Sequence, residues 1–137
     1  MITCAELRKL VENSEMENSK IELKSFRKLY ESKEGSKDIA RGIVALANRH
    51  GGRFIMGIND DGKFDGKLPI MSNSSEITID DFKEKIFHLI RDHISPTIEP
   101  ETEYLQCSEG DVLILNVPKR KGMPHAFIEK RECPMLL

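Results

Sequence analysis

Apolar residues recur along the chain at helical spacing in some segments and at alternate positions in others. Leu7, Leu10 and Val11 share one helical face and predict a short amphipathic helix over residues 3–12. Residues 21–26 alternate apolar and polar side chains, which is the pattern of a strand with one buried face. The chain is therefore expected to begin with a helix and a strand that are joined by a polar connection.

A longer helix is predicted from Ser36, a favourable N-cap residue, to the glycine pair Gly51-Gly52. Residues 53–58 form a compact apolar run that leads into the turn sequence of residues 59–62, as expected for a central strand. Strand-helix-strand units almost always make a right-handed crossover between parallel strands. The carboxyl ends of both strands should therefore lie at the same edge of the sheet, where we expect functional residues.

The second half of the chain predicts a helix and a hairpin. Residues 68–76 contain the turn formers Pro69, Asn73, Ser74 and Ser75, so we expect a mobile surface loop there. Residues 80–94 predict a packed helix that Pro96 ends, and residues 98–106 and 112–117 predict an antiparallel hairpin. The expected fold class is α+β: a central mixed sheet with a β-α-β crossover, followed by a helix and the hairpin, with helices packed on the sheet.

The chain has 137 residues, enough for one domain, so we expect a single domain over residues 1–137. Its formal net charge of -2 excludes a strong overall positive field, so any binding of nucleic acid must come from a local patch. The apolar runs, such as residues 42–47, are too short to span a bilayer, and no membrane association is expected. The residue after Gly52-x-x-x-x-Gly57 is Ile58, whereas a phosphate-binding P-loop requires lysine there.

Three cysteines lie at unrelated spacings: Cys4, Cys107 and Cys133. This pattern fits neither a disulfide framework nor a metal-binding knuckle. The first residues become polar at once and do not form a secretory signal. Reduced cysteines and a cytoplasmic location are therefore expected.

Glu22 and Lys24 share one face of the first predicted strand. A carboxylate can hold a hard divalent cation while a nearby ammonium steadies charge that develops on a phosphate, and restriction-type nucleases use an E-x-K pair of this kind. Exposed strand faces also carry alternating Glu and Lys as solvated or paired charge. Both interpretations stay open at this point.

Two further carboxylates are candidates for the same site. Asp60 follows the second strand and is expected on the side of the sheet where Lys24 also lies, although its surroundings are those of an ordinary turn. Glu17 precedes Glu22 by five residues, so an extended chain would carry it to the opposite face, about 16 Å away. Only a bend near Asn18-Ser19 would bring the two glutamates together.

One basic segment follows the last predicted strand: Lys119, Arg120, Lys121, His125, Lys130 and Arg131. Such a segment can neutralise phosphates, which would make binding depend strongly on salt. A solvated turn is the alternative interpretation. The Phe and Tyr residues mostly occupy positions expected in the core, so base stacking and sequence-specific readout are not indicated.

Three ordered motifs resemble the Schlafen-family AlbA-like domain over about residues 15–128. They are Glu17-x-x-x-x-Glu22-x-Lys24, then Ala45-x-x-Asn48-x-x-Gly51-Gly52-x-x-x-x-Gly57-x-x-Asp60-Asp61-Gly62, and later Val117-Pro118 with Pro124-His125. The resemblance implies a mixed α/β domain that binds nucleic acid. Some members are metal-dependent endoribonucleases that act on structured RNA such as transfer RNA.

The resemblance also implies roles for particular residues. Glu17, Glu22, Lys24 and Asp60 match the nuclease pattern, in which the three carboxylates would hold Mg²⁺ or Mn²⁺ and the lysine would face the scissile phosphate. The leading hypothesis is therefore a metal-dependent endoribonuclease, with Lys119, Arg120, Lys121 and His125 as nucleic-acid-binding residues. The alternative is a non-catalytic DNA- or RNA-binding module of the transcriptional-regulator type.

A second copy of the chain is a candidate partner, because the resemblance implies that two such lobes form a U-shaped cleft in Schlafens. The chain departs from the family pattern after residue 128, where an apolar tail ends it. This departure places the C-terminal edge outside the resemblance.

Overall fold

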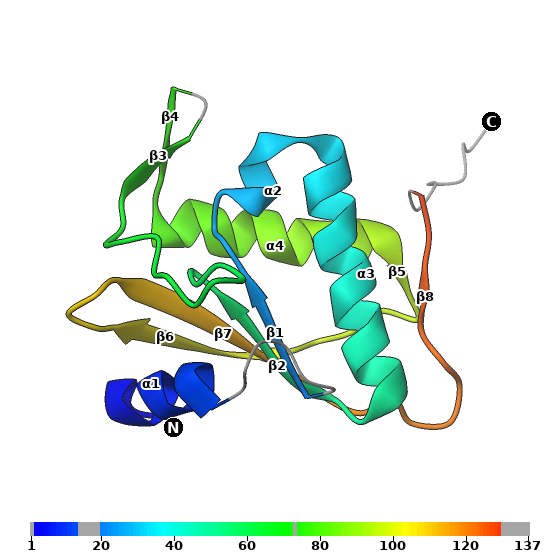
Figure 1. Cartoon of the computed structure of the whole chain (residues 1–137). Coiled ribbons are helices and arrows are strands. Elements are labelled where there is room, and N and C mark those ends of the chain that lie inside the picture. Colours follow the sequence, from blue (N-terminus) through cyan, green and yellow to red (C-terminus); the bar gives the residue numbers. More distant parts are fainter. Residues whose placement is uncertain (1, 14–19, 73, 130–137) are drawn as a thin grey trace.

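The computed structural model of the protein describes residues 2–13, 20–72 and 74–129 (Figure 1). The helices in these ranges are α1 (Cys4–Asn13), α2 (Lys28–Glu31), α3 (Lys33–Arg49) and α4 (Ile79–His93). The strands are β1 (Ile21–Lys24), β2 (Gly52–Met56), β3 (Ile70–Ser72), β4 (Ser75–Ile77), β5 (Ile94–Ser95), β6 (Glu101–Gln106), β7 (Asp111–Val117) and β8 (Ala126–Phe127). None of the described helices is long and apolar enough to cross a membrane.

β1 and β2 are parallel neighbours in a four-stranded sheet with the strand order β1-β2-β7-β6. Ile21 lies opposite Arg53 and Lys24 lies opposite Met56, so both strands begin at one end of the sheet and finish at the other. α3 connects them, which confirms the predicted β-α-β unit. β7 runs antiparallel to both β2 and β6, which confirms the hairpin and the mixed α+β fold.

The sheet has helices on both faces (Figure 1). α3 and α4 pack over the face that carries Phe54 and Met56 of β2, and α1 packs over the face that carries Ile55. Successive side chains of a strand point to opposite faces. Since Glu22 and Lys24 lie opposite Phe54 and Met56, they belong to the α3 side of the sheet.

α3 begins earlier than the sequence predicts. Ser32, rather than Ser36, is the N-cap residue, and its Oγ accepts a hydrogen bond from Gly35 N at 2.9 Å. The polar segment before α3 also contains the short helix α2. A Cβ atom at Gly35 would lie only 2.5 Å from Lys28 O, so glycine in the first turn of α3 lets α2 pack directly against it.

The prediction of a mobile surface loop over residues 68–76 missed the hairpin of β3 and β4, which the segment contains. Ile70 and Ile77 pair across this hairpin, and both are buried in the core on the α3 side. Most residues of this segment favour turns, so the two short strands leave no recognisable strand pattern in the sequence. A further strand pair, β5 with β8, was also not expected from the sequence.

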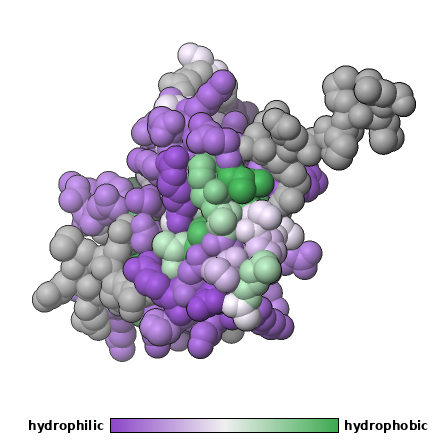
Figure 2. All heavy atoms as spheres, turned by 90° about the vertical axis from the view of Figure 1, so that its right-hand side faces the viewer, coloured by the Kyte–Doolittle hydropathy of each residue, from purple (hydrophilic) through white to green (hydrophobic). Residues whose placement is uncertain are grey.

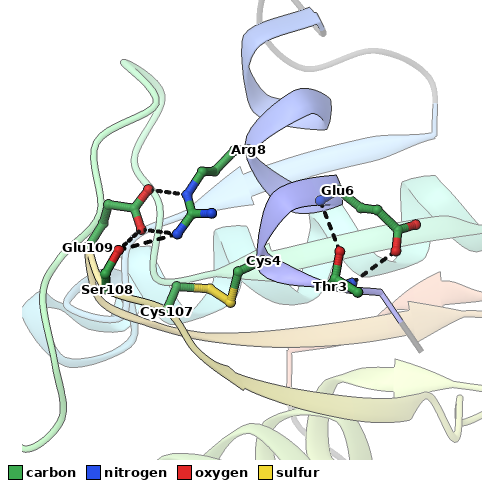
Figure 3. Close-up of a disulfide and its surroundings, with 7 residues drawn as sticks. All are labelled: Thr3, Cys4, Glu6, Arg8, Cys107, Ser108 and Glu109. Carbon is green, nitrogen blue, oxygen red and sulfur yellow. Dashed lines mark hydrogen bonds and ion pairs between the residues drawn. A yellow bond between two sulfur atoms is a disulfide. The ribbon is translucent and has the colours of Figure 1, made fainter.

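A disulfide between Cys4 and Cys107 joins α1 to the turn between β6 and β7 (Figure 3). The guanidinium of Arg8 binds the Glu109 carboxylate in the same turn, with N–O distances of 2.5 and 2.7 Å. The expectation of reduced cysteines was wrong for this pair, because a contact across 103 residues depends on the fold and leaves no spacing signal. Cys133 lies outside the described residues.

Candidate nucleic-acid interface

Glu22 and Lys24 lie side by side on β1, which is an outer strand of the sheet. Lys24 Nζ is 3.6 Å from Glu22 Oε1, which confirms that the two side chains share a strand face. Their side chains are only 17% and 20% exposed, so the pair lies at the margin of the core beside α3. This geometry fits a structural ion pair and also a carboxylate-ammonium pair that meets a phosphate.

Asp60 is exposed in the turn that follows β2. Asn59 Oδ1 orders this turn by accepting hydrogen bonds from Asp61 N at 2.9 Å and from Lys63 N at 3.0 Å. A Cβ atom at Gly62 would lie 3.2 Å from Val11 Cγ1, so the tip of the turn contacts α1. The turn thus leans toward the α1 side of the sheet, whereas Glu22 and Lys24 belong to the α3 side.

Asp65 is the carboxylate that the structure places beside the end of β1. Its two oxygens accept hydrogen bonds from Ser25 Oγ, both at 2.8 Å, and one also accepts from Phe26 N at 2.6 Å. Arg27 lies 3.7 Å away, and the Asp65 side chain is only 7% exposed. Asp65 therefore fixes the chain where it leaves β1, a role for which the sequence carries no spacing signal.

The described carboxylates do not assemble a cation site by themselves. Among residues 2–13, 20–72 and 74–129, no three His, Cys, Asp or Glu side chains are grouped so that they could hold a metal ion. Glu17, the third member of the predicted set, lies outside these residues. Bound Mg²⁺ or Mn²⁺ therefore stays a prediction.

The basic loop, residues 119–121, lies against the carboxyl end of α3. Arg120 N donates a hydrogen bond to Ala47 O at 2.9 Å, and the Arg120 guanidinium donates to Gly122 O at 2.5 Å. Lys119 and Lys121 are exposed. The loop thus presents two lysine side chains to solvent from a backbone that the last turn of α3 anchors.

Asn48 anchors the other end of this segment. Its Nδ2 donates to His125 O and its Oδ1 accepts from His125 N, both at 2.8 Å. The His125 ring nitrogen Nδ1 also donates to Pro96 O, at 2.5 Å. His125, which the sequence suggested as a nucleic-acid ligand, is therefore held by the protein through both its backbone and its ring.

Residues 17–134 match the model of the protein family described as Schlafen, AlbA_2. The chain belongs to the Schlafen AlbA_2 family. Its structure is similar to the solution structure of the N-terminal domain of an ATP-dependent DNA helicase RecG-related protein from Nitrosomonas europaea. That likeness has a TM-score of 0.56 and 19% sequence identity, and it covers 100% of this chain and 95% of the other. A search of curated proteins finds no significant match.

In this AlbA_2 domain, the Asn-x-x-Gly-Gly motif holds the basic loop in place. A Cβ atom at Gly51 would lie 2.7 Å from both Lys119 N and Val117 O, and Gly51 has a φ of +73°. Only glycine accepts that backbone conformation readily and leaves room for such a close approach. The motif by which the sequence resembles the family therefore positions the cations, and Asn48 is a site residue that residue chemistry alone did not indicate.

Proposed function

We propose that this AlbA_2 domain binds nucleic acid through the phosphate backbone, and that Lys119, Arg120 and Lys121 supply the main contacts. The observation that supports this proposal most directly is the exposed basic loop, which is anchored on the end of α3. Family membership supports the proposal, and so does the similar fold of a domain from a DNA helicase-related protein. Lysine and arginine contacts to phosphate position a protein on its ligand without reading the bases, so we propose binding that depends little on sequence.

The test is the affinity of the wild-type domain and of two charge variants for a fluorescently labelled duplex, measured by anisotropy. K119A/K121A removes the two exposed loop lysines, and K9A/K67A removes two exposed lysines elsewhere as the matched control. The proposal expects weaker binding and a shallower salt dependence for K119A/K121A, with K9A/K67A close to the wild type. Equal losses of affinity in both variants would show that the loop contributes only general charge attraction. If the wild type did not bind, the proposal would be overturned.

A second candidate function is endoribonuclease activity on structured RNA such as transfer RNA, with Mg²⁺ or Mn²⁺ as cofactor. The observation that favours it is the Glu22-Lys24 pair, a shielded carboxylate and ammonium 3.6 Å apart on an outer strand. A divalent ion bound there would supply charge neutralisation and an activated water. The position of Asp60 on the turn toward α1 is the feature that this candidate has to accommodate.

Incubation of transfer RNA with the domain, with Mn²⁺ or with EDTA, tests this second candidate. Metal-dependent cleavage that disappears in E22Q and in D60N, and persists in E76Q, would support the assignment. Glu76 is an exposed carboxylate on the β3-β4 hairpin and serves as the control. Cleavage that is unchanged in E22Q and D60N would exclude these carboxylates from the reaction.

A further inference from the structure

The beginning of β1 lies next to the glycine pair that supports the basic loop. Arg53 N donates a hydrogen bond to Lys20 O at 2.9 Å, and a Cβ atom at Gly52 would overlap Lys20 O. Lys20 is exposed. Since Gly51 contacts Lys119 in the same way, the two adjacent glycines place Lys20 and the loop on either side of one short backbone segment.

Arg49 belongs to the same end of the molecule. It is the last residue of α3, two residues beyond Ala47, whose carbonyl accepts the hydrogen bond from Arg120 N. Arg49 is exposed, and its Nε donates to Ala45 O at 3.2 Å, which holds the guanidinium against the last turn of the helix. Figure 1 shows that the end of α3, the starts of β1 and β2, and the chain after β7 meet at this end of the sheet. We call this group the basic end: Lys20, Arg49, Lys119, Arg120 and Lys121.

The described carboxylates on the strands near this end are Glu22 on β1 and Glu101 and Glu103 on β6. Glu22 lies on the α3 side, two residues beyond Lys20, and Lys24 Nζ is 3.6 Å from its Oε1. Glu103 accepts hydrogen bonds from Asn116 Nδ2 at 2.9 Å and from Ile2 N at 3.0 Å. These hydrogen bonds lower the pKa of Glu103, and they hold its carboxylate toward the α1 side of the sheet. Arg120 and Arg49, in contrast, are attached to the end of α3, so Glu103 does not share their face of the sheet, and Glu22 is partnered by Lys24.

Among the described residues, the basic end offers charge without an exposed phenylalanine or tyrosine side chain. Hydrophilic residues cover most of the described face that Figure 2 shows. Among the described residues, the exposed large apolar side chains are Met71, Phe87 and Met123, and the aromatic one, Phe87, belongs to α4. Proteins that hold single strands combine cations with aromatic platforms on which bases stack. A double helix carries about one phosphate charge per 1.7 Å of its axis, about twice the density of a single strand, which favours a surface that binds by charge.

We propose that the basic end is one continuous binding surface for double-helical nucleic acid, in which Arg49 and Lys20 contact phosphates together with the loop. This inference rests on the proposed function and extends it to a ligand class and to two further residues. It takes either a DNA or an RNA duplex, because both present the same phosphodiester charge. The Gly51-Gly52 pair brings the three cationic segments together, namely Lys20, the end of α3 and the basic loop.

The test compares two pairs of substitutions on the full chain. K20A/R49A removes the cations outside the loop, K119A/K121A removes those of the loop, and K9A/K67A is the control; circular dichroism checks that each variant folds. Each of the two pairs from the basic end is expected to make the slope of log K against log salt shallower by about two units. Each lost phosphate contact contributes about one unit. The four-residue combination should show the sum of both losses.

The probes are a DNA duplex, an RNA duplex of the same sequence, and their separate strands. The expected result is tighter binding of both duplexes than of the strands. Wild-type binding that K20A/R49A leaves unchanged while K119A/K121A weakens it would overturn the extended surface and leave the proposed function standing. Tighter binding of the single strands would overturn the ligand class. A wild-type protein that binds none of the probes would overturn the proposed function itself.

Discussion

The side-chain amide of Asn48, on the last turns of α3, makes two hydrogen bonds with the backbone of His125, 77 residues later in the chain. These bonds close the segment that begins with Arg120, which is itself bonded to Ala47. The segment that carries the basic loop is thus fastened to α3 at both ends. We infer that the shape of the binding surface depends on an uncharged residue.

Substitution of Asn48 tests this dependence. N48A removes both bonds at a partly buried position, so the free energy of unfolding should fall by about 1–3 kcal/mol. N48D keeps an acceptor for His125 N but sets a carboxylate oxygen against the His125 carbonyl oxygen, so its loss should be at least as large as that of N48A. Chemical denaturation of the three proteins measures the effect. Equal stability of all three would show that the segment is held by other contacts.

Gly51 and Gly122 form a matched pair for the role of backbone geometry. Their φ values are +73° and +76°, but a Cβ atom would lie 2.7 Å from two backbone atoms at Gly51 and would have no neighbour within 4 Å at Gly122. G122A should therefore cost only the conformational penalty of about 1–2 kcal/mol. G51A adds overpacking and should cost at least about 1 kcal/mol more. Similar unfolding free energies for both variants would contradict the close approach of the basic loop to Gly51.

The Cys4-Cys107 disulfide should contribute strongly to stability, because it closes a loop across 103 residues. The chain-entropy estimate for a loop of this size is about 4–5 kcal/mol, and measured values are commonly about 2–4 kcal/mol. Reduction of the wild type should lower the unfolding free energy by that order. C4S/C107S should show the lower value with or without reductant. Superimposable unfolding curves for oxidised and reduced wild type would count against the bond.

The environment of Tyr104 predicts a loss of folding stability at alkaline pH. Burial and the hydrogen bond from its hydroxyl to Asp111, at 2.8 Å, raise the pKa of Tyr104 to about 12. The pKa of an unfolded tyrosine is about 10, so this contribution to stability is complete below about pH 10 and is lost as the pH rises toward about 12. Ultraviolet titration of tyrosinate in the wild type and in Y104F identifies the Tyr104 transition. Ionisation of Tyr104 near its ordinary pKa would contradict the described contact.

Much of the fold follows from local sequence signals. The apolar period of residues 80–94 and the alternation around Glu22 each describe a regular element that packs on one side, and local periodicity is sufficient for that. The β-α-β unit follows from the order of elements and the crossover rule. The short strands β3 and β5 escaped prediction because two or three residues in a turn-rich segment give no readable period.

The sequence predicts the candidate site less well than the fold, for a geometric reason. The crossover rule fixes the edge of the sheet at which Lys24 and Asp60 follow their strands, but it does not fix the face toward which the next turn leans. The bridge between Ile58 and Phe64 and the contact of Gly62 with α1 decide that question, and both are tertiary. Glu17 lies outside the described residues, and the partnership with a second copy stays a prediction.

The salt dependence of duplex binding by the wild-type domain and by K119A/K121A is the most direct test of the central claim. We expect log K of the wild type to fall linearly with log salt, with a slope of about -4 or steeper, and the slope of the variant to be shallower by about two units. Binding that does not respond to salt, or the same salt dependence in both proteins, would contradict the claim that the basic loop holds the phosphate backbone.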